Sequence, residues 1–230
     1  MKTFFLSVFV VLSPFVMMAQ APQTIKLDNN KTSVEAINPE LQYLFSDFQP
    51  GNVVLKEGKV IKCKLNYNFL TDEMLFIDDK GKKMALANPH DVLNVYINNR
   101  LFVAAAKGYF EVIEKGAVSL VYKWTCNITE KGKEGALGIT TDAPSVYQMN
   151  QISFDARTWK LDVDKDAVVT VLVVPYLKIK TKYIPVKGTN DYSKAFPGKK
   201  AEIKLYVEQN QIDFRKEADL RKMTKYCNSL

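Results

Sequence analysis

The sequence predicts a mainly β protein of the α+β class. An antiparallel meander forms a sandwich or an open barrel, and a C-terminal helical pair packs on one end of it. Three observations lead to this fold. Apolar residues alternate with a period of two from residue 51, short polar turns interrupt that alternation, and a helical period replaces it from residue 190 onward.

The first nineteen residues have the pattern of a secretory signal peptide. Lys2 supplies a positive start, residues 4–16 are apolar, and Ala19 is a small residue suited to cleavage. The apolar stretch is too short for a membrane span. We therefore expect an exported mature protein that is soluble and has no membrane span. Its location would be periplasmic or outer-membrane-associated, or it would be secreted.

Residues 20–37 are polar and are expected to form a flexible N-terminal segment. A β-rich domain should cover residues 38–189 and begin with a short helix. Asn38 can cap that helix, Pro39 suits its first turn, and Leu44 and Phe45 share one of its faces.

About eight strands are then expected, joined by hairpin turns in which glycine or asparagine supplies a positive φ angle. These turns are Lys56-Glu57-Gly58, Asp79-Lys80-Gly81, Asn98-Asn99 and Glu114-Lys115-Gly116. Residues 127–150 have no clean period and are expected to form a mobile or functional loop. Strands should resume over residues 151–163 and 167–186. Residues 167–174 are apolar on both faces, as in a central covered strand, and Pro175 suggests a bend or an edge.

The C-terminal helical segment should cover residues 190–230 and pack on the β-rich domain. A turn over residues 190–195 precedes a helix over 198–210, to which Ile203, Leu205 and Val207 contribute apolar side chains. A second helix over 213–230 can be capped by Asp213. Its inward stripe is expected to be Leu220, Met223 and Cys227.

Positive charge is concentrated in the C-terminal part of the chain. The formal charge of the whole chain is +7, and residues 176–230 contain thirteen Lys or Arg against six Asp or Glu. Such an excess is typical of a surface that attracts an anionic partner, although solvated strand and helix faces have the same composition. The strand lysines are expected to share one strand face. The candidate binding residues are Lys178, Lys180, Lys182, Lys199, Lys200, Arg221 and Lys222.

Three cysteines allow at most one disulfide bond. The strand alternation and the helix stripe place Cys63, Cys126 and Cys227 on apolar faces, so we expect buried free thiols. A bridge between Cys63 and Cys126 is the alternative.

No catalytic or metal site is predicted, and no cofactor is expected. His90, the single histidine, follows Asn88-Pro89 and precedes Asp91, which is the pattern of a polar turn between two strands. Asp78-Asp79 and the aspartates at 162, 164 and 166 have turn composition without the spacing of an EF-hand loop. Asp72, Glu73 and Asp155 could serve a carboxylate-dependent hydrolase. The aromatic residues Tyr109, Phe110, Tyr122 and Trp124 could line a pocket, but their alternation favours packing in the sheet.

Residues 55–78, 82–92 and 195–230 together resemble a family of exported proteins, about 230 residues long, from Bacteroidetes-type Gram-negative bacteria. The resemblance is one of pattern and spacing, and it covers about a third of the chain. It implies a periplasmic or outer-membrane-associated setting. The family has no assigned activity, so no site residue carries over. Relatives often have an acidic residue at the position of His90, which argues against a catalytic histidine.

The expected function is that of a non-enzymatic exported binding or accessory protein of the bacterial cell envelope. The alternatives are a carboxylate-dependent hydrolase that acts on glycans or cell wall, and a lipid-binding β cup. The expected partner is an envelope protein or an anionic surface, and nucleic acid is not expected.

Overall fold

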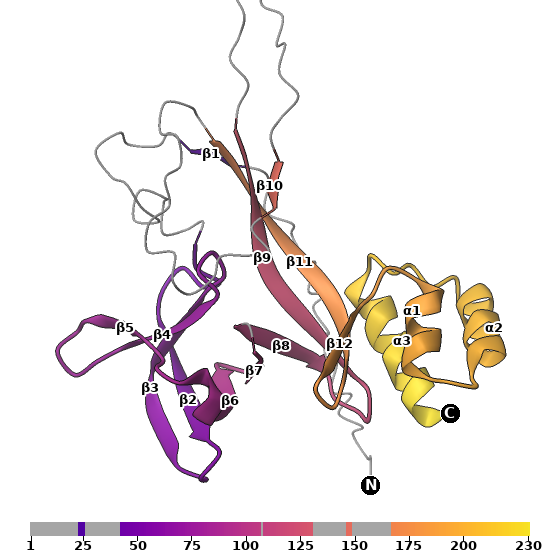
Figure 1. Cartoon of the computed structure of the whole chain (residues 1–230), viewed down its shortest axis with the longest axis horizontal. Coiled ribbons are helices and arrows are strands. Elements are labelled where there is room, and N and C mark those ends of the chain that lie inside the picture. Colours follow the sequence, from indigo (N-terminus) through magenta and orange to yellow (C-terminus); the bar gives the residue numbers. More distant parts are fainter. Residues whose placement is uncertain (1–22, 26–41, 107, 131–145, 149–166) are drawn as a thin grey trace, which may run out of the picture.

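The computed structural model describes residues 23–25, 42–106, 108–130, 146–148 and 167–230. Within them, one antiparallel sheet contains every strand, and three helices lie at one end of it (Figure 1). The mainly β fold with C-terminal helices is thereby confirmed. The strands are β1 (Gln23–Ile25), β2 (Gln49–Leu55), β3 (Val60–Asn68), β4 (Glu73–Ile77), β5 (Lys83–Ala85), β6 (Val92–Ile97), β7 (Arg100–Ala104), β8 (Tyr109–Glu114), β9 (Ser119–Glu130), β10 (Val146–Gln148), β11 (Ala167–Ile179) and β12 (Lys182–Pro185).

The strand order is β1-β11-β9-β8-β7-β6-β2-β3-β4-β5, with β10 paired to β9 and β12 paired to β11. The predicted single meander is therefore wrong in one respect. It is divided into two meanders, β2–β5 and β6–β9, which join where β6 pairs with the free edge of β2. Because β1 and β5 end the path without pairing to each other, the sheet is not closed.

Four predicted segments differ from expectation or fall outside the described residues. The predicted signal peptide and the strand over 151–163 lie outside them. Residues 23–25, within the predicted flexible segment, form β1 and pair with β11. The short helix predicted from Asn38 is wrong over residues 42–48, which contain no helix. The backbone N–H of Leu44 donates to the carbonyl of Tyr67, so this segment uses its hydrogen bonds against β3 instead.

The predicted turns have the expected backbone at three of four positions. Gly58, Gly81 and Asn98 have φ angles of 90°, 78° and 51°. Gly116 is not among the residues with positive φ. A Cβ atom there would lie 2.4 Å from the side-chain nitrogen of Asn228, so glycine is needed for close packing against α3 rather than for its φ angle.

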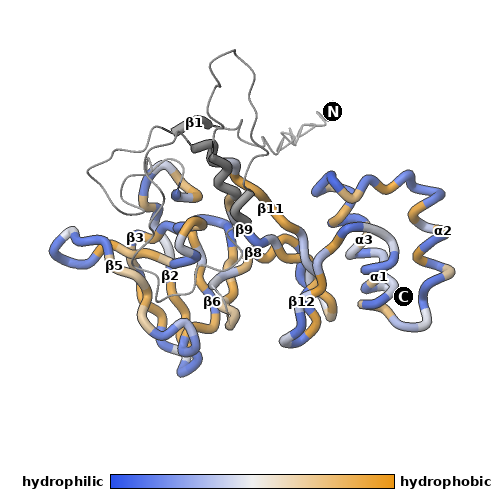
Figure 2. The backbone as a smooth tube through the Cα atoms, turned by 45° about the horizontal axis from the view of Figure 1, so that its top comes forward, coloured by the Kyte–Doolittle hydropathy of each residue, from blue (hydrophilic) through white to orange (hydrophobic). Residues whose placement is uncertain are grey.

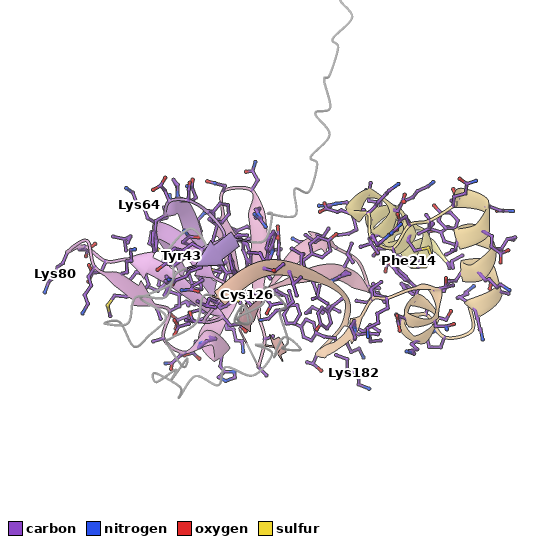
Figure 3. All side chains as sticks on the ribbon, turned by 90° about the horizontal axis from the view of Figure 1, so that it is seen from above. Tyr43, Lys64, Lys80, Cys126, Lys182 and Phe214 are labelled. Atoms are coloured by element: carbon purple, nitrogen blue, oxygen red, sulfur yellow. The ribbon has the colours of Figure 1, made fainter. Side chains whose placement is uncertain are left out.

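Two hydrophobic cores share one face of the long β9–β11 ladder. The register pairs Val171 with Cys126 toward one core and Leu177 with Leu120 toward the other. The first core consists of Val53, Leu65, Tyr67, Phe69, Leu70, Met74, Val92, Val95, Ile97, Phe102, Tyr109 and Cys126. The second core consists of Ile113, Val118, Leu120, Tyr122, Leu177, Val186, Tyr192, Ala195, Ile203, Ile212, Leu220, Met223 and Cys227. Figure 3 shows Cys126 within the β body and Phe214 among the helices.

The strand β11 is central in the sheet, as predicted, because it pairs with β9 on one side and with β1 and β12 on the other. Figure 2 shows β11 as a largely hydrophobic stretch. Its residues 171–174 are nevertheless only half-buried, so full coverage of both faces is not observed. Pro175 lies inside the strand, and its carbonyl accepts a hydrogen bond from the N–H of Val186 at 2.8 Å.

The C-terminal segment contains three helices rather than two: α1 (Thr189–Ala195), α2 (Lys200–Asn210) and α3 (Glu217–Ser229). The predicted turn over 190–195 is therefore wrong, because α1 forms there and buries Tyr192 in the second core. Leu205 is 54% exposed, so its predicted apolar contribution is also wrong. The inward stripe of Leu220, Met223 and Cys227 is confirmed.

Asp213 does not cap α3, which begins after Lys216. The carboxylate of Asp213 instead accepts hydrogen bonds from the backbone N–H and the guanidinium of Arg215. The helix therefore begins one turn later than the cap signal predicts.

All three cysteines are free thiols, as predicted. Cys126 and Cys227 are buried, whereas Cys63 is only half-buried, contrary to expectation. Burial raises the pKa of the Cys126 and Cys227 thiols to about 12 and raises the pKa of Cys63 as well.

We expect the three thiols to differ in reactivity, because alkylation requires an accessible thiolate. At about pH 8, iodoacetamide should modify Cys63 in the native protein, while Cys126 and Cys227 should react only after denaturation. Peptide mass spectrometry of protein alkylated with and without denaturant measures this difference. Equal modification of all three thiols under native conditions would contradict the packing described above.

Candidate functional site

The predicted strand lysines do not share one face of a single strand, so that part of the prediction is wrong. The strand β11 ends at Ile179, and Lys180 takes a φ angle of 53° in the turn to β12. The register pairs Lys178 with Tyr183 and Ile179 with Lys182. Because residues paired across a ladder point to the same face, Lys178 and Lys182 lie on opposite faces of the hairpin.

The predicted lysines of the helices lie at the protein surface. Lys199 and Lys200 lie at the start of α2, where Lys199 Nζ is 3.7 Å from a carboxylate oxygen of Glu202. Lys222 is exposed on α3, and its ammonium lies 6.0 Å from the centroid of the Tyr206 ring. That ring is stacked on Tyr226 at 3.7 Å. These lysines therefore face solvent at or near the helix surface.

Arg221 connects α3 to the sheet through a hydrogen bond and an ion pair with β8. Its Nε donates to Glu217 Oε1 at 2.7 Å, within the helix. Its NH1 donates to the backbone carbonyl of Ile113 in β8 and lies 3.7 Å from the carboxylate of Glu114. Arg221 is thus used in contacts within the protein.

Five of the predicted residues form no ion pair within the part of the chain that the structure describes. We refer to them as the unpaired lysines: Lys178, Lys180, Lys182, Lys200 and Lys222. Four of them are exposed, and Lys178 is half-exposed. They come from the β11–β12 hairpin and from α2 and α3, which are neighbouring elements at one end of the molecule (Figure 1).

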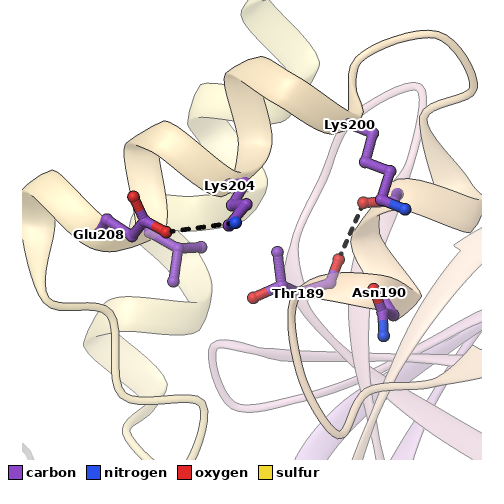
Figure 4. A pocket seen from close by; sticks show the side chains of 7 residues that line it. Thr189, Asn190, Lys200, Lys204 and Glu208 are labelled. Atoms are coloured by element: carbon purple, nitrogen blue, oxygen red, sulfur yellow. Dashed lines mark hydrogen bonds and ion pairs between the residues drawn. The ribbon is translucent and has the colours of Figure 1, made fainter.

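A hollow of about 210 Å³ lies between α1 and α2 (Figure 4). Thr189, Asn190 and Ser193 contribute to it from α1. The lining residues from α2 are Lys200, Lys204, Val207 and Glu208. One of the unpaired lysines, Lys200, therefore lies at a concave part of the surface.

Sequence reasoning missed an ion pair between β7 and β8 whose carboxylate is buried. Arg100 of β7 binds both carboxylate oxygens of Glu111 in β8, at 2.6 and 2.5 Å. Glu111 is 7% exposed and also accepts a hydrogen bond from Trp124 Nε1 at 2.8 Å. The guanidinium carbon of Arg100 lies 5.2 Å from the ring centroids of both Phe45 and Trp124. The geometry is that of a bidentate charge pair between a guanidinium and a carboxylate.

A second charged cluster, also missed, is centred on Asp72. Both of its carboxylate oxygens lie 2.6 Å from Lys123 Nζ, and the hydroxyl of Tyr67 donates to it. Burial lowers the pKa of Lys123, and the Asp72 carboxylate opposes that effect. Burial, followed by the charge of Asp72, raises the pKa of Tyr67 well above its usual value, so the phenol keeps its proton.

These contacts bear on the proposed carboxylate hydrolase. The oxygens of Asp72 are occupied by Lys123 and Tyr67, and Glu73 accepts a hydrogen bond from the hydroxyl of Thr71 at 2.9 Å. Asp155 lies outside the described residues. Both described candidates, Asp72 and Glu73, are thus engaged in internal contacts.

The remaining candidates have structural roles. Residues Pro89–Asp91 form one turn of 3-10 helix after Asn88, whose φ angle is 53°, and His90 is exposed. The predicted polar turn is confirmed. Asp78 Oδ1 accepts hydrogen bonds from the N–H groups of Lys80 and Lys82, which makes it a turn residue too.

The aromatic residues pack in the sheet, as their alternation predicts. Tyr109, Phe110 and Tyr122 are buried, and Trp124 is half-buried. The aspartates at 162, 164 and 166 lie outside the described residues. Among the residues that the structure describes, no three His, Cys, Asp or Glu side chains lie close enough together to hold a metal ion.

Among the helices that the structure describes, none combines the length and the apolar composition needed to cross a membrane.

Comparison with known proteins identifies no relative: no protein-family model, no curated protein and no solved structure matches the chain.

Proposed function

We propose that the protein is a non-enzymatic exported binding or accessory protein of the bacterial cell envelope, and that its basic C-terminal surface binds an anionic partner. The observation that carries the proposal is the set of unpaired lysines. Their charges have no carboxylate partner in the described part of the chain, so they are available to an external anion. The envelope setting rests on the signal-peptide pattern and on the family resemblance.

Physical arguments connect these lysines to binding rather than to stability. An exposed ion pair contributes only about 0–1 kcal/mol to folding, so lone exposed lysines have little structural value. A cluster of like charges, by contrast, raises the association rate with an oppositely charged surface. Because salt screens such charges over about 10 Å at 0.1 M, binding of this kind weakens as salt is added.

The two alternative functions receive less support. The hydrolase needs a carboxylate free to act on substrate, and the described candidates Asp72 and Glu73 are engaged in internal contacts. A lipid-binding cup needs empty space against the apolar face of the sheet. Fully buried side chains of the first core, among them Leu65, Tyr67 and Phe102, pack closely together there.

The proposal is tested with a charge-reversal variant in which Lys180, Lys182, Lys200 and Lys222 are replaced by glutamate. Arg221 is left unchanged, because it makes internal contacts with β8 and its loss could act through the packing of α3. In the matched control, four exposed lysines of the β2–β3 hairpin are replaced by glutamate: Lys56, Lys59, Lys62 and Lys64. The two variants therefore have the same net charge. Figure 3 shows Lys64 on the far side of the β body from the helices and Lys182 beside them.

Tagged wild-type protein is incubated with envelope extract, and retained proteins are identified by mass spectrometry. We expect a partner that the wild type and the control variant retain at low salt and release at high salt. The C-terminal variant should not retain it. If both variants retain the partner equally, or both lose it equally, the C-terminal surface is not the binding site.

A further inference from the structure

The hollow between α1 and α2 is too small for most organic ligands. Its volume is about 210 Å³, below the roughly 300–1,000 Å³ of typical small-molecule pockets. It can therefore receive a single small group that projects from a larger partner. The chemistry of its lining indicates which group this is.

The α2 side of the hollow is positively charged. Lys200 and Lys204 are separated by four residues, so both side chains lie on the same face of the helix. Lys204 Nζ is 3.8 Å from Glu208, but the side chains of both residues are more than 60% exposed, so this pair is weak. Lys200 has no partner within the described residues. Two ammonium groups thus meet one carboxylate, which leaves an excess of one positive charge.

The α1 side of the hollow supplies neutral hydrogen-bond donors. Ser193 Oγ donates to the carbonyl of Thr189 at 3.2 Å, so its proton is already used within α1. The hydroxyl of Thr189 and the amide of Asn190 make no hydrogen bond within the described part of the chain. Thr189 and Asn190 belong to α1 and the two lysines to α2, so the polar lining of the hollow comes from both helices.

We infer that this hollow binds a phosphate group carried by the anionic partner. The inference deepens the proposed function and rests on it. A phosphate group offers three terminal oxygens in a tetrahedral arrangement, which suits a lining whose polar groups come from two helices. A planar carboxylate accepts through two oxygens and suits the flat fork of an arginine, which the hollow lacks. Lysine binds phosphate as a point charge and tolerates this geometry.

Nuclear magnetic resonance titration of the full chain with inorganic phosphate and with methyl phosphate tests the inference. Acetate at equal ionic strength serves as the competing anion. We expect both phosphates to shift the amide signals of α1 and of the first half of α2, and acetate to leave them unchanged. Lys200→Gln combined with Thr189→Val should weaken phosphate binding about tenfold or more, since a hydrogen bond to a charged group contributes about 1.5–3 kcal/mol.

The control variant is Lys180→Gln, which removes an unpaired lysine that does not line the hollow. It should bind phosphate as the wild type does. Equal binding of phosphate by all three proteins, or equal effects of acetate and phosphate, would overturn the inference. If Lys200→Gln with Thr189→Val still retains the envelope partner while the four-lysine variant loses it, the phosphate inference fails and the proposed function stands.

Discussion

Replacing Arg100 by alanine is expected to lower the free energy of unfolding by about 3 kcal/mol, because it leaves the buried carboxylate of Glu111 without its cation. Glu111 is 7% exposed, and two of its hydrogen bonds come from Arg100. Trp124 alone cannot replace them. The side chain of Arg100 is 29% exposed, so we use the lower end of the range observed for broken buried pairs. Urea denaturation followed by circular dichroism measures the change.

Two further variants separate the charge pair from simple loss of side-chain volume. Arg100→Met combined with Glu111→Leu removes both charges and should recover most of the lost stability, because no unpaired charge remains buried. Arg215→Ala breaks an ion pair of similar length, at 2.9 Å, on an exposed side chain and should leave the midpoint unchanged within error. If Arg100→Ala is as mild as Arg215→Ala, the ion pair does not have the structural role assigned to it.

Replacing Met223 by alanine is expected to cost about 2–5 kcal/mol, which is the usual cost of truncating a large buried side chain to alanine. Met223 is 0% exposed in the second core, which holds the three helices on the β9–β11 ladder. Its loss leaves a cavity beneath α3. Urea denaturation of the full chain gives the magnitude.

The matched control is Met84→Ala on the edge strand β5, where the side chain is 39% exposed. That substitution should change the free energy of unfolding by less than about 0.5 kcal/mol. Similar losses at both positions would show that Met223 does not lie in a closely packed core.

The strands were predictable from sequence because each hairpin is a local signal. Gly58, Gly81 and Asn98 mark turns whose backbone requires a positive φ angle, and each turn joins strands that are neighbours in sequence. The division of the sheet into two meanders was not predictable in this way. It depends on β6 pairing with β2 across some forty residues, and no local residue pattern specifies that contact.

The wrong predictions of a helix around Leu44 and of a single strand face for the lysines have related causes. Leu44 and Phe45 fit a helical period, but the backbone of this segment forms a hydrogen bond with β3 instead. Lys178, Lys180 and Lys182 alternate as in one strand, yet the chain turns at Lys180, a residue that seldom adopts positive φ. In both places the observed conformation follows the tertiary contacts rather than the local sequence pattern.

The charged clusters differ in how far the sequence could have revealed them. The β7–β8 hairpin pairs Phe102 with Glu111, which places Arg100 two residues away on the same face. That ion pair could have been found from the register of a predicted hairpin. Asp72 and Lys123 are separated by 51 residues, so only the fold brings them together.

The basic surface was predicted from composition, and the structure refines which residues form it. Composition counts every lysine and arginine equally, whereas geometry shows that Arg221 is used internally and that Lys199 is paired with Glu202. The binding surface that we propose is therefore the set of unpaired lysines, with the hollow beside Lys200 as its concave part.

Lysine footprinting tests most directly whether this surface binds the partner. The full chain is acetylated in the presence and in the absence of envelope extract, and the modification of each lysine is read by mass spectrometry. The proposed function predicts protection of Lys178, Lys180, Lys182, Lys200 and Lys222, with unchanged modification of Lys56, Lys59, Lys62 and Lys64. Protection confined to the β2–β3 hairpin lysines, or equal modification of both groups with and without extract, would contradict it.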